Sequence, residues 1–186
     1  GLIQSSGQRL VQAATDAASK LDMMILERYS DIQLLSNAPI IRDHNPDTVT
    51  QYLRNKAQAH SAYQWIGITD SHGRIVAATD TSKTSIDRSQ SHWFQLARTI
   101  TGVRILDPRV DEEFGGTSAF TIIAPLRSPD GRFIGAIAAV VSVSSLMQIL
   151  DDTMQVLKNV EWTDASHLEY QLLNEKGNLI GDSTQR

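Results

Sequence analysis

The fold is decided by the stretch Gln64-Trp-Ile-Gly-Ile-Thr-Asp-Ser-His-Gly-Arg-Ile-Val-Ala-Ala-Thr79, which has the pattern of a β-hairpin. A second stretch, Pro125-Leu-Arg-Ser-Pro-Asp-Gly-Arg-Phe-Ile-Gly-Ala136, repeats it. In both, a turn containing Asp and Gly separates runs of β-branched and aromatic residues, which is a strong short-range hairpin signal. The second turn also has Pro and Gly at the positions that a tight turn favours.

The other elements follow from hydrophobic periodicity and from capping residues. Asn45 is a good N-cap, Pro46 suits the first helical position, and Asp47 favours the positive end of the helix dipole. Near-continuous apolar character from Ile134 to Val141 predicts a central strand that is covered on both faces. We therefore predict an α+β fold. Its strands are Gln64–Thr69, Arg74–Thr79, Val103–Leu106, Thr117–Leu126 and Arg132–Val143, and its helices are Leu2–Ser36, Pro46–Ala59, Ser89–Thr101 and Ser144–Asn159.

The first of these helices is unusually long. About 35 residues at 1.5 Å each span roughly 50 Å. Asn37 suits a left-handed C-cap, and Pro39 cannot continue the helix. Two interpretations remain open: a long helix packed along its own domain, or a helix whose first part projects toward a membrane or a twin helix in a dimer.

Composition excludes several classes of protein. The net charge of −4 and the pI near 5.7 argue against a nucleic-acid-binding protein. Cysteine is absent, which excludes disulfides and thiolate metal sites. The histidines are scattered, no apolar run reaches the roughly 20 residues of a membrane span, and Gly115-Gly-Thr-Ser118 lacks the lysine of a phosphate-binding loop. We therefore expect no metal, no cofactor and no catalysis in this chain.

Six segments follow one another along the chain after the long helix: Asp70-Ser-His-Gly73, Ala78-Thr-Asp80, His92-Trp-Phe-Gln-Leu-Ala97, Asp107-Pro108, Pro125 and Asp130-Gly-Arg-Phe-Ile-Gly135. In this order they resemble the double Cache sensor domains, also called PDC or extracellular PAS-like domains, of bacterial membrane receptors. The resemblance implies a PAS-like antiparallel sheet on a long N-terminal helix. It also implies four parts: a signalling and dimerisation helix (1–37), a membrane-distal sensor module (38–143), a linker helix (144–167) and the start of a truncated second module (168–186). Glu169–Gly181 echoes the first hairpin, and we expect the chain to be a piece of a longer protein.

The resemblance also bears on the ligand. Family members that bind amino acids have an Arg two residues before a Trp-Tyr pair, and Ser91 stands there in this chain. They have a Tyr-x-Asp step, which here is Arg109-Val-Asp111, and a further Asp near Val140, which is absent. An α-amino acid is therefore not the expected ligand. A small metabolite that is weakly polar or bears a carboxylate fits better, since pockets are mostly apolar with a few polar contacts. The predicted ligand-binding residues are Ile68, Ser91, His92, Trp93, Phe94, Arg109, Asp111 and Thr121.

Plainer roles are open for most of this set. Trp93 and Phe94 are also explained by core packing, His92 by a solvated helix position, and Arg109 with Asp111 by a surface ion pair. The function predicted from the sequence is a small-molecule-sensing input domain, extracytoplasmic and part of an inner-membrane receptor. The receptor is expected to be a sensor histidine kinase and to form a homodimer through the N-terminal helix. The alternatives are the sensor of a chemoreceptor or diguanylate cyclase, a structural or dimerisation module with a vestigial pocket, and a cytosolic PAS- or GAF-like domain with a cofactor.

Overall fold

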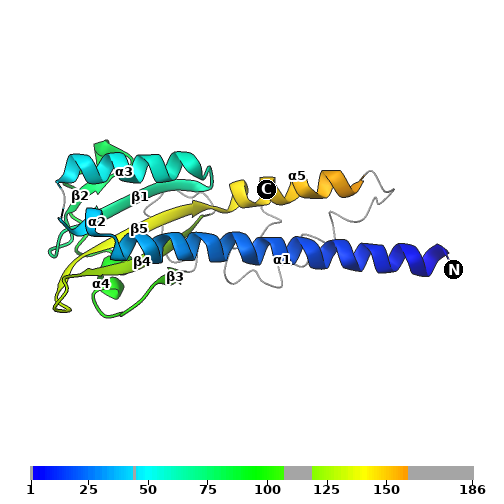
Figure 1. Cartoon of the computed structure of the whole chain (residues 1–186), viewed down its shortest axis with the longest axis horizontal. Coiled ribbons are helices and arrows are strands. Elements are labelled where there is room, and N and C mark those ends of the chain that lie inside the picture. The colour runs from blue at the N-terminus through cyan, green and yellow to red at the C-terminus, as the bar shows by residue number, and fades with distance from the viewer. Residues whose placement is uncertain (1, 44, 107–118, 159–186) are drawn as a thin grey trace.

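The computed structural model describes residues 2–43, 45–106 and 119–158. Within these ranges, five strands form one antiparallel sheet, and a long helix lies along one of its faces (Figure 1). This is the predicted α+β, PAS-like architecture. In chain order the elements are α1 (Leu2–Asn37), α2 (Pro39–Asp43), α3 (Pro46–Ala59), β1 (Tyr63–Thr69), β2 (Ile75–Ala78), the 3₁₀ helix η1 (Thr81–Lys83), α4 (His92–Ala97), β3 (Arg104–Leu106), β4 (Ala119–Arg127), β5 (Phe133–Ser142) and α5 (Val143–Lys158).

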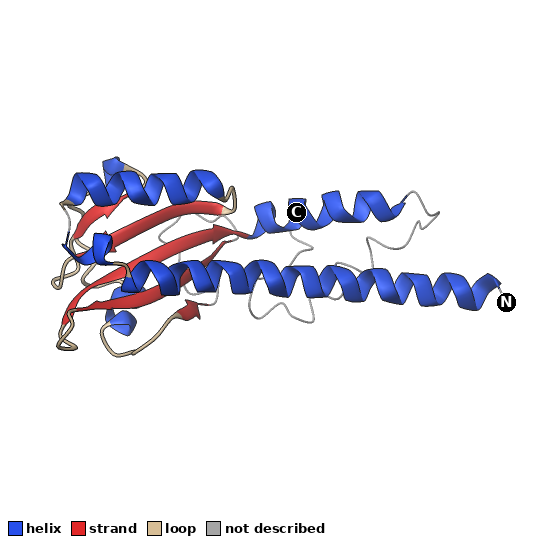
Figure 2. Ribbon diagram, in the orientation of Figure 1, coloured by secondary structure: helices blue, strands red, loops and turns tan. Residues whose placement is uncertain are grey.

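The strand order is β2-β1-β5-β4-β3, so the two predicted hairpins, β1–β2 and β4–β5, lie side by side. β5 is the central strand, and its residues from Gly135 to Ser142 are all buried. The prediction of a strand covered on both faces is confirmed. Its continuous apolar sequence reflects helices that pack on either side of the sheet (Figure 2).

Both hairpin turns have the same construction. The N–H of Gly73 donates to the carbonyl of Asp70 at 3.2 Å, and the N–H of Gly131 donates to that of Ser128 at 2.8 Å. The two glycines have φ of +90° and +85°, a conformation that other residues rarely adopt. A glycine at the fourth position of each turn, Gly73 or Gly131, therefore closes both reversals of the chain.

α1 has the predicted extent but not the predicted ending. Among the described residues other than glycine, only Ser85 has a positive φ, so Asn37 is not a left-handed cap. Its side-chain amide instead donates to the carbonyl of Gln33 at 2.9 Å, and Arg42 donates to the carbonyl of Asn37 at 2.6 Å. These two side chains pair carbonyl groups at the end of the helix. The next helix, α2, begins two residues later at Pro39, which suits a first helical position.

α3 begins as predicted. The side chain of Asn45 accepts a hydrogen bond from the N–H of Thr48 at 2.9 Å, with Pro46 in the first turn. The helix then buries Val49 and Leu53 against the sheet. Local capping chemistry and one apolar stripe are sufficient to define this element.

The two faces of the sheet have separate cores because successive residues of a strand point in opposite directions. The face covered by α1 and α3 collects Ile32, Leu53, Ile66, Phe120 and Ile137. The face covered by α4 collects a different set: Trp65, Ile75, Ala78, Trp93, Phe94, Ala97, Ile100, Leu106, Ile123, Ala136, Ala138 and Val140. A ligand between the sheet and the Trp93 segment would lie on the second face.

The first part of α1 extends past the sheet and packs against α5 (Figure 1). The buried side chains of Ala17 and Leu21 on α1 belong to the same core as Leu146 and Leu150 on α5. The two helices run in opposite directions, so the beginning of α1 and the end of α5 lie at the same end of the molecule (Figure 1). In the described part of the chain, no helix, α1 and α5 included, combines the length and the apolar character of a membrane span.

Candidate functional site

The α4-covered face of the sheet is built in rows across the strands. Trp65 on β1 pairs with Val140 on β5, Val140 pairs with Thr121 on β4, and Thr121 pairs with Leu106 on β3. Paired residues of antiparallel strands project on the same side. Thr121 is only 3% exposed, so its hydroxyl is a buried polar group in this row.

The next row along the sheet is made of small residues. Gly67 on β1 pairs with Ala78 on β2 and with Ala138 on β5. The indole of Trp65 fills the space above the glycine, because a Cβ at residue 67 would lie 2.1 Å from the ring atom Cη2. The ring of Trp65 therefore lies along the sheet, and the small side chains make room for it.

α4 covers these rows with two aromatic side chains. Trp93 and Phe94 are 1% and 0% exposed, and their rings meet edge to face with centroids 6.3 Å apart. Phe94 also meets the ring of Phe133 edge-on at 5.9 Å. Both predicted residues are thus core residues of the α4-covered face, whereas His92, at the start of the same helix, is exposed.

α4 is shorter than the predicted Ser89–Thr101 helix. Ser91 is its N-cap and is buried. After Ala97 the helix tightens, because the N–H of Thr99 donates to the carbonyl of Leu96, three residues earlier. The predicted bounds of this short helix were too wide, since the apolar periodicity continues to Ile100, beyond the last helical residue, Ala97.

Ile68 was predicted to share the site with Trp93, but it lies on the other face of the sheet. It pairs with Ala77 and Ile137, and all three belong to the core under α1 and α3. The structure brings Ser91, Trp93, Phe94 and Thr121 to the α4-covered face or its edge. Arg109 and Asp111 lie outside the described residues, as does the predicted second module (168–186).

Sequence reasoning missed Trp65 and Gly67. Residues two apart in a strand share a face, so these two lie together and alternate with Ile66 and Ile68. The signal was present in the sequence as a Trp-x-Gly spacing. It was hidden because almost every residue of β1 is buried, which leaves no polar side to identify the faces.

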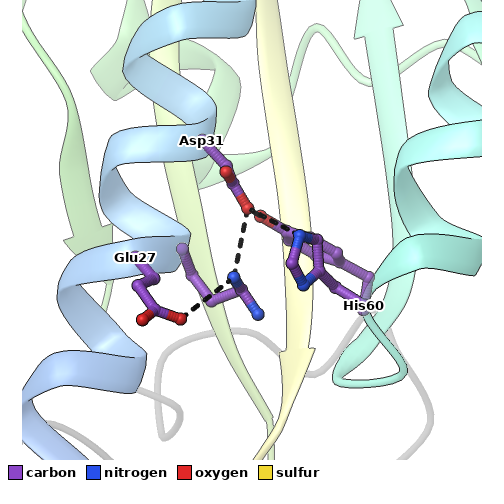
Figure 3. Close-up of polar contacts among 5 residues, drawn as sticks. Glu27, Asp31 and His60 are labelled. Carbon is purple, nitrogen blue, oxygen red and sulfur yellow. Dashed lines mark hydrogen bonds and ion pairs between the residues drawn. The ribbon is translucent and has the colours of Figure 1, made fainter.

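A polar cluster on the opposite face links α1 to the start of β1 (Figure 3). The carboxylate of Asp31 accepts from the hydroxyl of Tyr63 at 2.9 Å and pairs with Nε of Arg28 at 3.2 Å. Nε2 of His60 lies 4.0 Å from the same carboxylate, and Glu27 lies 3.6 Å from Nη2 of Arg28. Burial, together with the neighbouring carboxylate, raises the pKa of the Tyr63 hydroxyl far above its ordinary value. The cluster holds the helix to the sheet, and within it Nε of Arg28 is buried with an ion pair to Asp31 but no hydrogen bond.

In the described part of the chain, His, Cys, Asp and Glu side chains form no group of three or more that could hold a metal ion. The core under α4 instead consists of packed aromatic rings, small side chains and a few buried hydroxyl groups. Such a face suits a small organic molecule more than an ion.

No protein-family model and no curated protein matches the sequence. Solved structures do match the fold. The extracellular domain of the putative histidine kinase rpHK1S-Z16 aligns with a TM-score of 0.55 and 19% identity over 82% of this chain and 63% of that chain. The E. coli DcuS sensor domain aligns at 0.52 and 13% identity over 75% of this chain and 98% of that one.

The fold is that of the Cache sensor domains. A third Cache structure, the ligand-binding domain of the Pseudomonas aeruginosa PAO1 amino acid chemoreceptor PctC in complex with GABA, aligns at 0.62 and 17% identity over 78% of this chain and 68% of that one. The chain thus spans less than two thirds of the histidine-kinase domain but nearly all of the DcuS domain. The Cache fold occurs in these comparisons in both histidine kinases and chemoreceptors, so the fold does not distinguish between the two outputs.

Proposed function

We propose that this chain is the extracytoplasmic small-molecule-sensing input domain of a membrane-anchored bacterial receptor, namely a sensor histidine kinase. The observation that carries the proposal is the Cache fold, with its long helix on one face of the sheet and an aromatic core on the other. The domain binds a ligand and performs no reaction itself. The output domain lies elsewhere in the receptor.

The proposed ligand site is the α4-covered face, with Trp93 and Phe94 as its aromatic wall and Thr121 and Ser91 as polar contacts. Its ligand is a small metabolite that is weakly polar or bears a carboxylate, rather than an α-amino acid. Ser91 supports this choice, because the Cache domains that bind amino acids share an arginine at this position. Arg109 and Asp111, between β3 and β4 in the sequence, are proposed to complete the site.

The proposed signal is a shift of the sheet against α1. A ligand favours whichever arrangement of α4 and the sheet it binds more tightly, because only a difference in affinity moves an equilibrium between two states. The polar cluster around Asp31 connects β1 to α1 through the hydrogen bond that the Tyr63 hydroxyl donates to Asp31. A displacement of β1 would therefore be transmitted to the helix. This route gives the binding event a physical path to the ends of α1 and α5.

A dimer through α1 would carry the signal onward. Met23, Leu26 and Leu34 are apolar but 56%, 56% and 69% exposed, and their spacing puts them on one side of the helix, away from the sheet. Burying an exposed leucine against a partner contributes about 1.5–3 kcal/mol. We propose that a second copy of the chain covers this stripe.

The test is a thermal-shift screen of the purified chain against a metabolite panel, followed by calorimetry of each hit. Thr121→Val removes the buried hydroxyl while keeping the side-chain shape, and we expect it to weaken binding about 5- to 20-fold. Thr15→Val, an exposed position on α1, is the matched control and should leave the affinity unchanged. Binding that Thr121→Val does not affect would contradict this site, and the absence of any hit would favour a structural module.

A further inference from the structure

A cavity of about 180 Å³ lies between the last turns of α1 and the outer edge of β4. β3 pairs with β4 only from Thr121 to Ile123, so in the described structure no strand covers the outer edge of β4 from Ala124 to Arg127. α1 contributes Tyr29 and Gln33 to this α1–β4 cavity. The cavity lies beside α1 at the edge of the sheet, and Arg127, which lines it, also contacts Ile100 and Phe133 at the border of the α4-covered face.

Several polar groups that line the α1–β4 cavity are available to a ligand. Within the described part of the chain, the hydroxyl groups of Tyr29 and Thr101 and the side-chain amide of Gln33 have no hydrogen-bond partner. Gln33 and Thr101 are exposed, so the cavity is open to solvent. Water satisfies these groups until a molecule with its own polar atoms displaces it.

Among the described residues that line the α1–β4 cavity, Arg127 is the only charged one, and none of them carries an acidic side chain. Its guanidinium donates to the carbonyls of Ile100 at 3.1 Å and Gly131 at 3.2 Å, and lies 5.9 Å from the centroid of the Phe133 ring. These contacts hold the group in place but use two of its five N–H donors. A fixed guanidinium with spare donors and no neighbouring acid favours a carboxylate.

We propose that the α1–β4 cavity binds a small hydroxycarboxylate, with the carboxylate at Arg127 and the hydroxyl near Gln33 and Thr101. The amide of Gln33 can donate or accept, and so can the hydroxyl of Thr101, which suits an alcohol group. A molecule bound there contacts α1 and β4 together. Occupancy therefore stabilises the packing of the last turns of α1 against the sheet, and this site is separate from the proposed sensing site under α4.

The experiment is an NMR titration of the isotope-labelled chain with lactate and malate, and with glycerol as a neutral comparison. We expect the amides of Gly102, Val103 and Ser36 to shift with either acid and not with glycerol. Gln33→Glu puts a carboxylate into the cavity at an exposed helix position and should weaken binding of both acids at least tenfold by like-charge repulsion. Gln8→Glu makes the same change at an exposed position near the start of α1 and should change the affinity less than twofold.

Thr121→Val separates this proposal from the proposed sensing site. If the acids bind in the α1–β4 cavity, Thr121→Val leaves their affinity unchanged. Binding that is lost in Thr121→Val but kept in Gln33→Glu would overturn the cavity proposal and support the α4-covered face instead. Equal shifts with glycerol would overturn the assignment to a carboxylate, and no shift with either acid up to about 20 mM would overturn the site itself.

Discussion

The indole ring of Trp65 lies directly over Gly67, close enough that a methyl group on residue 67 would overlap the ring at 2.1 Å. This contact allows a tryptophan to lie along a central strand rather than stand away from it. Trp93 and Phe94 pack in the same core as this ring, so the position of the ring also sets how closely α4 approaches the sheet.

Gly67→Ala should therefore destabilise the domain by about 1–3 kcal/mol, because the buried ring must leave its position or the strands must separate. The free energy of unfolding is measured by urea titration. Gly102→Ala is the control, since a Cβ there has no neighbour within 4 Å, and we expect a change within about 0.5 kcal/mol. Equal stability of Gly67→Ala and the parent chain would show that Trp65 does not occupy this position.

Tyr63→Phe should cost about 1–2 kcal/mol of unfolding free energy. The substitution removes the hydroxyl that donates to Asp31 and leaves the partly buried carboxylate with one hydrogen bond fewer. Tyr52→Phe on α3 is the matched control, since no bond to its hydroxyl is found in the described structure, and it should have little effect. Similar losses in the two variants would argue against a specific bond between α1 and β1.

The same hydroxyl predicts a loss of stability in alkaline solution. The pKa of Tyr63 is raised on folding, so the native chain holds this proton more tightly than the unfolded chain. Its contribution is complete below the unfolded pKa of 10.0 and declines as the pH rises above it, by up to about 1.4 kcal/mol per pH unit. The difference in unfolding free energy between the parent chain and Tyr63→Phe should shrink above about pH 10. A constant difference would contradict the linkage.

Leu26→Glu together with Leu34→Glu should convert a dimer into a monomer, because each places a charge on the exposed apolar stripe of α1. Light scattering coupled to size-exclusion chromatography gives the mass directly. Gln58→Glu together with Gln90→Glu adds the same charge at exposed positions outside α1 and should leave the dimer intact. A parent chain that is monomeric at all concentrations would contradict the proposed dimer.

Local chemistry made much of the fold predictable. The turns at Asp70–Gly73 and Ser128–Gly131 depend on glycine at a position of positive φ, and the start of α3 depends on Asn45 and Pro46. Each of these signals acts over about four residues, so no distant contact can change it. The end of α1 was harder to predict, because the carbonyl of Asn37 accepts a hydrogen bond from Arg42 in the following helix.

The sequence by itself determined the two hairpins, the central strand, the long helix and the resemblance to Cache domains. Only the tertiary structure decided which side chains meet at the site. β1 is apolar on both sides, so nothing in its pattern told Ile68 from Trp65, and the wrong residue was assigned to the α4-covered face. The faces become distinct only when α1 and α3 pack on one side and α4 on the other, since burial on both sides removes the polar alternation that would otherwise identify them.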